Sequence, residues 1–275
     1  MPYFVLGEDN VTLSDKYFAT NQADEAEIER LGMLAQIYDP ITIKHIETLG
    51  IKNGWKCLDV GAGGGSVADW LSDRVGADGK VVATDTNTKF LNYFKNPKFE
   101  IRQHNIINGE IKENYYDMVH CRFLLMHLNE YQKALDKMAA AIRPGGWLLI
   151  EEMDYISHTA IERDNEAIFI NEYNSKRMEQ LSKSGILDPY FGRQVRRLVE
   201  ELGFEAIGNE GNSVIYRGGD IYGLWNYKTG RAGISNLNAD ENTLKAHEIA
   251  ERRNTDPLYY SLSPTIFSAW GRKPE

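Results

Sequence analysis

Five short apolar segments alternate with segments of helical periodicity between residues 55 and 152, and no other feature constrains the fold as strongly. The expected strands cover residues 55–60, 80–85, 99–103, 115–120 and 147–152. Strands that alternate with helices predict a parallel sheet with helices on both faces. A sixth strand over 205–217, bent at Gly211, and a last strand over 264–270 complete a doubly wound α/β fold with a mostly parallel, seven-stranded sheet.

The segments outside this alternation are largely helical in pattern. Apolar residues spaced three and four apart predict one helix over 26–38 and another over 41–49, separated by Pro40. The run Arg143-Pro144-Gly145-Gly146 predicts the end of a helix before the fifth strand, because proline lacks an amide and glycine accepts left-handed dihedrals. A further helical pattern covers 161–181.

Two additions to the sheet are expected. Residues 1–50 would form an N-terminal helical cap, and residues 51–275 would form the α/β domain. Helical insertions around 155–190 and 219–260 would form a lid over the substrate. Aromatic side chains in the insertions could line an apolar pocket, although for any single one of them ordinary packing of helices on the sheet is the better explanation. They include Tyr155, Phe169, Tyr173, Tyr222, Trp225, Tyr227, Tyr259 and Tyr260.

Composition narrows the class of partner. The 275 residues include 31 Lys and Arg against 40 Asp and Glu, a formal charge of −9, which argues against nucleic acid or an anionic membrane. The first residues contain neither the basic segment nor the long apolar segment of a signal peptide. No apolar stretch reaches the roughly 18 residues of a membrane span. Cys57 and Cys121 lie in apolar strands, so we expect two reduced, buried thiols in a cytoplasmic protein.

A glycine-rich loop follows the first strand, in the run Asp59-Val60-Gly61-Ala62-Gly63-Gly64-Gly65. Glycines allow a sharp turn and the close approach of a ligand. The helix that starts after the loop offers free amides and the positive end of its dipole to a negatively charged group. Such a loop suits either the pyrophosphate of a dinucleotide or the carboxylate of a cofactor derived from an amino acid.

The spacing of the glycines favours the second ligand. A dinucleotide fingerprint of the form G-x-G-x-x-G would need glycine at Ser66, whereas the chain reads D-x-G-x-G-x-G from Asp59. Asp85 ends the second strand 20 residues after Gly65. A carboxylate there can accept hydrogen bonds from both hydroxyls of a ribose. Taken singly, Asp85 could cap a helix and Asp59 could be a solvated charge, but together with the loop they favour a nucleoside site.

Four motifs follow one another with consistent order and spacing over about residues 50–155. They are Leu58 to Gly65, Val81 to Asp85, Tyr116-Asp117-Met118-Val119-His120, and Arg143-Pro144-Gly145-Gly146 before Trp147. Together they resemble the class I S-adenosylmethionine-dependent methyltransferases. The run from His120 to Leu128 looks like the ubiquinone/menaquinone-biosynthesis-like branch, whose members methylate small molecules. The resemblance implies a Rossmann-like methyltransferase fold with S-adenosyl-L-methionine as the cofactor.

The resemblance also implies roles for individual residues around the methionine moiety. The glycine loop would pass along it, the first carboxylate would lie near its amino group, and the end of the fourth strand would reach it through the backbone. These positions are Asp59, Gly61, Ala62, Gly63, Cys121 and Arg122.

The nucleoside end would have its own contacts. Asp85 would hold the ribose and Thr86 would flank the adenine. The adenine ring would lie beside His104-Asn105-Ile106, where the family often has aspartate in place of Asn105; the carbonyl oxygen of this residue could still accept the adenine amino proton. Tyr17 would close over the cofactor from the N-terminal segment.

The chemistry expected is methyl transfer to oxygen, nitrogen or carbon of a small, aromatic or hydrophobic metabolite. An in-line displacement on a sulfonium already has an activated leaving group, so orientation supplies much of the acceleration. A base is needed only when the acceptor keeps its proton. His158 lies just after the fifth strand, where open α/β sheets bind ligands, and neutral imidazole suits that work. The alternative is a solvated loop histidine.

Two other functions remain open from the residues alone. One is an NAD(P)-dependent oxidoreductase that uses the same loop, against which Ser66 and Asp59 weigh; the other is a non-catalytic protein that keeps the cofactor fold. The chain has no carboxylate cluster with metal-ligand spacing, so no metal site is expected, and it has no Asn/Asp-Pro-Pro-Tyr run typical of enzymes that methylate nucleic-acid bases. The oligomeric state, a homodimer included, is left open.

Overall fold

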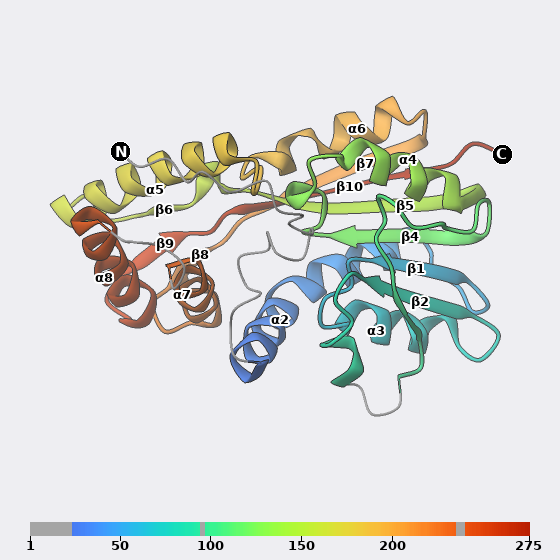
Figure 1. Cartoon of the computed structure of the whole chain (residues 1–275), viewed down its shortest axis with the longest axis horizontal. Coiled ribbons are helices and arrows are strands. Elements are labelled where there is room, and N and C mark those ends of the chain that lie inside the picture. The colour runs from blue at the N-terminus through green and yellow to red at the C-terminus, as the bar shows by residue number, and fades with distance from the viewer. Residues whose placement is uncertain (1–23, 94–96, 235–239) are drawn as a thin grey trace.

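The computed structural model describes residues 24–93, 97–234 and 240–275 (Figure 1). Its strands are β1 (Lys56–Val60), β2 (Lys80–Asp85), β3 (Glu100–Gln103), β4 (Tyr116–Arg122), β5 (Ile142–Asp154), β6 (Thr159–Ala160), β7 (Glu205–Asn212), β8 (Ile215–Arg217), β9 (Tyr260–Leu262) and β10 (Thr265–Arg272). Its α-helices are α2 (Asp24–Thr48), α3 (Ser66–Val75), α4 (Tyr131–Ala141), α5 (Asn165–Ser184), α6 (Val195–Glu201), α7 (Ile221–Ile234) and α8 (Glu241–Thr255).

Seven strands form the main sheet, in the order β3-β2-β1-β4-β5-β10-β7 (Figure 1). The pairs from β3 across to β5 are parallel, and β10 is antiparallel to both β5 and β7. The predicted doubly wound, mostly parallel sheet of seven strands is therefore confirmed. The strand order reverses between β1 and β4, and open α/β sheets bind ligands at the carboxyl ends of the strands beside such a point.

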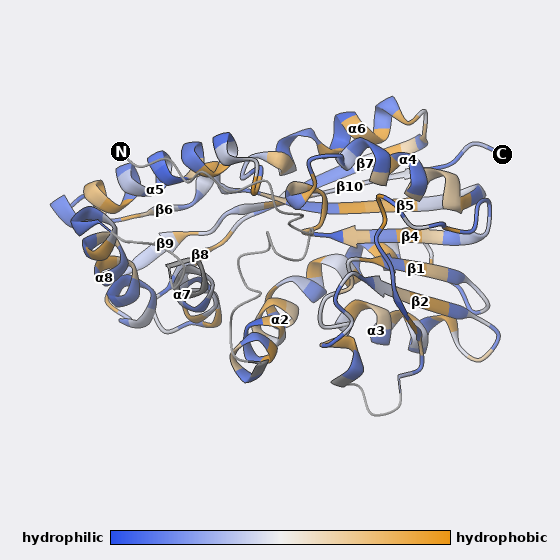
Figure 2. Cartoon of the chain, viewed as in Figure 1, coloured by the Kyte–Doolittle hydropathy of each residue, from blue (hydrophilic) through white to orange (hydrophobic). Residues whose placement is uncertain are grey.

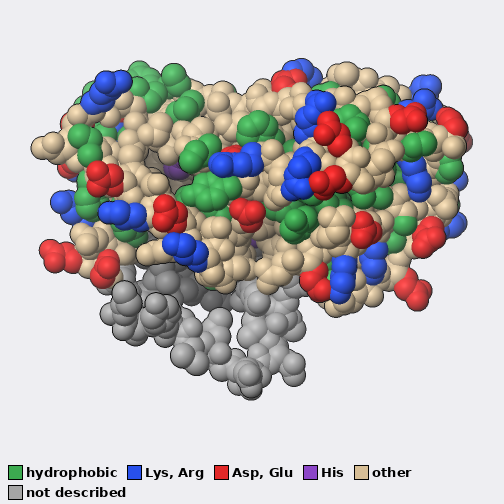
Figure 3. Space-filling view, turned by 90° about the horizontal axis from the view of Figure 1, so that it is seen from above, with side chains coloured by type: hydrophobic (Ala, Val, Ile, Leu, Met, Phe, Trp, Pro, Cys, Tyr) green, Lys and Arg blue, Asp and Glu red, His purple; other side chains and the backbone are tan. Residues whose placement is uncertain are grey.

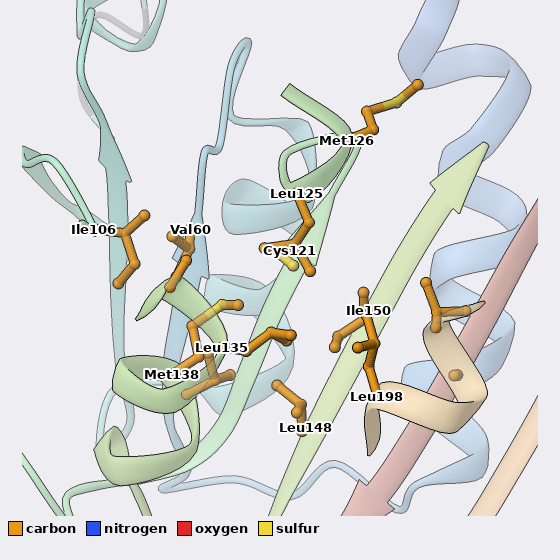
Figure 4. Close-up of a cluster of buried hydrophobic side chains, with 14 of the residues drawn as sticks. Val60, Ile106, Cys121, Leu125, Met126, Leu135, Met138, Leu148, Ile150 and Leu198 are labelled. Carbon is orange, nitrogen blue, oxygen red and sulfur yellow. The ribbon is translucent and has the colours of Figure 1, made fainter. Parts of the chain in front are cut away.

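Helices cover both faces of this sheet. In Figure 1, α2 and α3 lie on one face, while α4 and α6 lie on the other. The central strands are apolar along most of their length (Figure 2), because both of their faces are buried. The core under α4 and α6 includes Val60, Leu135 and Ile150 (Figure 4), and the core under α2 and α3 includes Cys57 and Leu71.

The N-terminal helix differs from the expected pair of helices. α2 is a single helix that contains Pro40, so the predicted interruption was wrong. A proline inside a helix removes one hydrogen bond and crowds the carbonyl four residues earlier. Tertiary contacts on both sides outweigh this cost: Tyr38 and Ile46 are fully buried, and Asp39 accepts a hydrogen bond of 2.8 Å from Arg122 on β4. Periodicity alone carries no information about those contacts.

The fifth strand begins earlier than expected. α4 ends at Ala141, and the residues predicted to end this helix ahead of the strand, Arg143 to Gly146, already form the irregular start of β5. Gly145 has a φ of +72°, and its amide donates to the carbonyl of Lys273 at 2.9 Å. The register between β4 and β5 shifts at this point. Proline and glycine therefore stop the helix as predicted, and the chain continues directly as a bulged strand.

The segment expected as one bent strand over 205–217 is two strands in different sheets. β7 pairs with β10 in the main sheet, and β8 pairs with β9 in a three-stranded sheet of order β6-β9-β8. Gly211 lies within β7 rather than at the break. The small sheet was not predicted, since its strands of two or three residues are too short to show periodicity.

The small sheet, α5, α7 and α8 stand beyond the carboxyl ends of β4 and β5 (Figure 1). Of these elements, α5, α7, α8 and β6 fall within the predicted insertions 155–190 and 219–260, whereas β8 precedes the second insertion and β9 extends beyond it. Helix α2 contacts both α3 and α7. The division into a cap and an α/β domain stays a prediction. None of the helices in the described ranges is both long enough and apolar enough to cross a membrane.

Candidate active site

The glycine loop forms the turn between β1 and α3, beside the point where the strand order reverses. Gly61, Gly63 and Gly65 have φ angles of +70°, +54° and +78°, which glycine adopts without strain. The amide of Gly61 donates to the carbonyl of Thr84 at 2.8 Å, which fastens the loop to the end of β2. A Cβ atom on Gly61 would lie 3.0 Å from Cδ1 of Leu124. The loop therefore lies tightly against the turn that follows β4.

Asp85 bonds directly to this loop. Its Oδ2 accepts a hydrogen bond of 3.0 Å from the amide of Gly63, and its Oδ1 accepts one of 3.0 Å from the amide of Asn87. Burial raises the pKa of Asp85, and these amides act in the opposite direction. Each carboxylate oxygen keeps a lone pair, so the group can accept further donors such as sugar hydroxyls. The loop and the second carboxylate thus form one site.

Asp59 is a buried, partnered carboxylate rather than a solvated charge. β1 and β4 pair so that Asp59 stands opposite His120, and Oδ1 of Asp59 lies 2.8 Å from Nδ1 of His120. Nε2 of His120 lies 3.3 Å from Oε2 of Glu151 on β5. The first carboxylate of the motif is therefore oriented from behind by the sheet.

The residues predicted at the adenine follow β3. The amide of His104 donates to the carbonyl of Asp85 at 2.9 Å, which brings this segment to the site. The side-chain oxygen of Asn105 accepts from the amide of Ile107 at 2.9 Å, so one of its lone pairs is used. Ile106 is buried in the core (Figure 4) and Thr86 is exposed. Tyr17 lies outside the described residues.

The end of β4 turns its side chains into the protein. Cys121 is fully buried, and burial raises the pKa of its thiol. Arg122 donates to Thr42 and Asp39 of α2, at 2.8 Å each. Phe123, the next residue, has a φ of +54°, which is uncommon for a bulky side chain and typical of functional turns. A ligand would meet Cys121 and Arg122 through the backbone.

His158 belongs to a different cluster. Its Nε2 lies 3.3 Å from the hydroxyl of Tyr216, which donates to Asn254 and accepts from Asn226. Burial lowers the pKa of His158 to about 4, so the ring is neutral at pH 7. These partners come from the lid elements, and the glycine loop is not among them.

A carboxyl beside the loop was missed as a specific site residue. Oε1 of Glu152 accepts from the amides of Leu124 and Leu125, at 3.0 and 2.7 Å, and burial raises the pKa of this carboxyl to about 8. Its Oε2 is buried and has no hydrogen-bond partner among the described residues. The only signal in the sequence was a glutamate at the end of a buried strand, which is equally typical of an exposed end.

An aromatic cluster follows the same turn. The ring of Tyr38 packs edge-on against Phe123, Tyr222 and Trp225, with centroids 5.0, 5.7 and 5.7 Å away. Tyr222 and Trp225 are among the aromatic residues predicted to line a pocket, whereas the sequence of the N-terminal segment indicates only a helical position for Tyr38. Within the described ranges, no three or more His, Cys, Asp or Glu residues are arranged to hold a metal ion.

Comparisons with known proteins agree with this geometry. The family described as methyltransferase domain matches residues 29–208, more than half of the chain. The ubiquinone/menaquinone biosynthesis C-methyltransferase of Idiomarina loihiensis is 32% identical over 119 residues, which cover 39% of this chain and 46% of that protein. The chain thus spans about half the length of the curated relatives it matches first.

Two solved structures show the same fold. Phosphoethanolamine N-methyltransferase 2 of Haemonchus contortus, in complex with phosphomonomethylethanolamine and S-adenosylhomocysteine, has a TM-score of 0.59 at 13% identity and covers 96% of this chain and 61% of its own. The [4+2]-cyclase SpnF has a TM-score of 0.52 at 14% identity, with 87% and 82% covered.

At such identities the likeness shows the fold alone, and the family match carries the assignment. That match agrees with the order of the four motifs and with the loop held to Asp85. The chain belongs to the methyltransferase-domain family, and its motifs resemble those of the class I S-adenosylmethionine-dependent methyltransferases.

Proposed function

We propose that this protein transfers a methyl group from S-adenosyl-L-methionine to oxygen, nitrogen or carbon of a small molecule. One observation carries the proposal beyond family membership: the amide of Gly63 donates to Asp85, so the loop and the carboxylate expected at the ribose meet in one site. A Cβ atom at Gly61 would crowd Leu124, so the glycine lets the loop lie close against the neighbouring turn.

The residues present fit this cofactor. Asp85 would accept from the ribose hydroxyls, Asp59 would face the amino group, and the loop from Gly61 to Gly63 would pass along the methionine chain. When bound, the cofactor supplies a methyl group on an activated sulfonium. The chain's own residues orient it, and the packed turn after β4 would exclude water from one side.

The acceptor would enter between the loop and the lid. Phe123 and Tyr222 are partly exposed and pack against the buried ring of Tyr38, and this aromatic surface supports a small, aromatic or hydrophobic acceptor. Glu152 adds a carboxyl beside the same turn. Three properties stay predictions: the absence of nucleic-acid and membrane partners, the formation of a homodimer, and a cytoplasmic location. Positive and negative side chains are mixed over the face of the molecule seen in Figure 3.

Calorimetry with four ligands tests the cofactor assignment. We expect S-adenosylmethionine and S-adenosylhomocysteine to bind and NAD(H) and NADP(H) not to bind. Binding of a nicotinamide dinucleotide without either adenosyl compound would favour an oxidoreductase and overturn the proposal. A labelled-methyl screen of aromatic and isoprenoid acceptors then tests transfer. Failure of all acceptors despite cofactor binding would favour a non-catalytic role or another reaction, and the cyclase shows that this fold supports other chemistry.

His158 stays a prediction for the general base. We expect His158→Ala to slow transfer while S-adenosylhomocysteine binds as before, because the ring lies in the lid cluster rather than in the loop. An unchanged rate and an unchanged pH–rate profile would discard the assignment.

A further inference from the structure

Buried polar side chains form a continuous line across the face of the main sheet that α2 covers. Asp59 on β1 contacts His120 on β4, and His120 contacts Glu151 on β5, at 2.8 and 3.3 Å. Glu151 also accepts a hydrogen bond of 2.7 Å from Ser268 on β10. Each of these residues is at most 3% exposed. Such a line is costly to bury unless its members pair with one another, as these residues do.

The line carries charge. Burial alone would lower the pKa of His120, but its hydrogen bonds to the carboxylates of Asp59 and Glu151 outweigh burial and raise this pKa to about 9. Burial alone would raise the pKa of Glu151, but hydrogen bonds with His120 and His45 lower it. At neutral pH an imidazolium therefore stands between two carboxylates, and two negative charges share one positive charge.

The other charged groups near this line are already paired. Arg122 also favours the charged form of Glu151, but it forms an ion pair with Asp39 at 2.8 Å. At the outer end, Nε2 of His45 lies 3.5 Å from Glu210, which is paired with Lys44 at 2.7 Å. The network that contains Asp59 thus keeps one uncompensated carboxylate.

Glu151 is also the attachment point of α2. The hydroxyl of Thr42 donates to Oε2 of Glu151, and Nδ1 of His45 lies 3.2 Å from Oε1. The same helix places Leu31 over the glycine loop, where a Cβ atom on Gly64 would lie 3.4 Å from the Cβ atom of Leu31. One carboxylate therefore holds both the histidine behind Asp59 and the helix that covers the loop.

We propose that His120 and Glu151 are positioning residues that link recognition of a ligand's amino group at Asp59 to the seating of α2 over the glycine loop. This inference rests on the proposed function, because it takes the bound nucleoside to carry an amino-acid chain. His120 engages Oδ1 of Asp59, and no described residue donates to Oδ2, which is left for an ammonium group. The ammonium supplies the missing positive charge and weakens the hold of Asp59 on His120.

An NMR titration of the His120 ring in the full-length protein tests the link. The probes are S-adenosylhomocysteine, which has the amino-acid chain, and 5′-methylthioadenosine, which lacks it. We expect S-adenosylhomocysteine to lower the pKa of His120 from about 9 and 5′-methylthioadenosine to leave it unchanged. The resonance is assigned with His120→Gln, or through its shift in Glu151→Gln if the first variant does not fold.

Calorimetry on variants gives a second readout. Glu151→Gln should weaken binding of S-adenosylhomocysteine on the order of tenfold, the value of one charge-assisted hydrogen bond, and should affect 5′-methylthioadenosine much less. Thr42→Val should also weaken binding of S-adenosylhomocysteine more than binding of 5′-methylthioadenosine, but by a smaller factor. It replaces Glu151→Gln as the test if that variant does not fold. Glu201→Gln, an exposed carboxylate paired with Arg197, is the matched control and should change neither affinity.

The two proposals fail in different ways. An equal response of His120 to both probes, or equal weakening of both ligands in Glu151→Gln, would overturn the link while leaving the proposed function intact. Failure of both nucleosides to bind the unmodified protein would overturn the proposed function itself.

Discussion

The β1–β4 half of the sheet and the lid elements meet at the same sheet edge, but they are built under different constraints. In the first, backbone torsions and single hydrogen bonds fix the residue: Gly61 needs a positive φ, and Asp85 must accept from the amide of Gly63. In the lid, rings such as Tyr216 and Tyr222 stack at 5.7 Å, a contact that other aromatic pairs could make. The cofactor can therefore be predicted from individual residues in the first region. In the second region, the acceptor preference depends on the packing of many side chains and cannot be predicted in this way.

The largest effect is expected from Gly61→Val. A side chain at a φ of +70° costs about 1–2 kcal/mol, more when it is β-branched, and it would collide with Leu124. We expect binding of S-adenosylhomocysteine to fall by more than roughly 100-fold, the affinity equivalent of about 3 kcal/mol. Calorimetry measures this, with circular dichroism as the check on folding. A folded variant that binds normally would remove the loop from the site.

Asp85→Ala should have the next largest effect. Loss of a charged hydrogen-bond acceptor at the ribose should cost about 1.5–3 kcal/mol of binding free energy, which corresponds to a dissociation constant roughly 10–150-fold weaker. Asp85→Asn keeps one acceptor oxygen, so its dissociation constant should lie between those of the unmodified protein and Asp85→Ala. An unchanged dissociation constant in folded Asp85→Ala would contradict the ribose contact.

Glu152 lies at the border between the two regions, and its protonation should be visible in stability. Its pKa is raised to about 8 in the folded protein, so the stability linked to its proton is present below the unfolded pKa near 4.5 and is lost as pH rises toward 8. Glu152→Gln lacks this loss, so its stability relative to that of the unmodified protein should be greater at pH 8 than at pH 4.5.

Denaturant unfolding of both proteins at the two pH values measures the Glu152 effect. The pH dependence contributed by His120 is common to both proteins and cancels in the difference. A stability difference that does not change with pH would mean that Glu152 is ionised when folded.

The smallest effect is expected in the lid, from Gly230→Ala on α7. Among the described residues, no atom lies within 4 Å of a Cβ placed there, and the φ of Gly230 is not positive. Alanine should stabilise the folded protein by about 0.4–1 kcal/mol, because it lowers the conformational entropy of the unfolded chain. Thermal unfolding measures this, with unchanged binding of S-adenosylhomocysteine as the companion result. A large loss of cofactor binding would show that this lid helix is as tightly constrained as the glycine loop.

Sequence predicted the sheet well because central strands buried on both faces are short, mostly apolar runs. It misjudged Pro40, since the contacts of Tyr38 and Asp39 that stabilise α2 come from β4 and the turn after it, far away in the sequence. It could not foresee the small sheet, whose strands form only through pairing between segments far apart in the chain.

The site was predictable where a backbone requirement selects the residue. The glycine loop and Asp85 meet as expected, because their roles depend on φ angles and on one strand end. The pairing of Asp59 with His120 was not predictable, because it depends on the register of β1 against β4. A buried glutamate such as Glu151 resembles an exposed one in sequence, and only the packing of α2 shows what it holds.

A crystal structure of the protein with S-adenosylhomocysteine tests the central claim most directly. The account predicts the homocysteine chain along Gly61 to Gly63, the ribose hydroxyls within hydrogen-bond distance of Asp85, and the amino group facing Oδ2 of Asp59. A glycine loop without ligand in crystals that hold the nucleoside elsewhere, or a ribose that Asp85 does not touch, would contradict it.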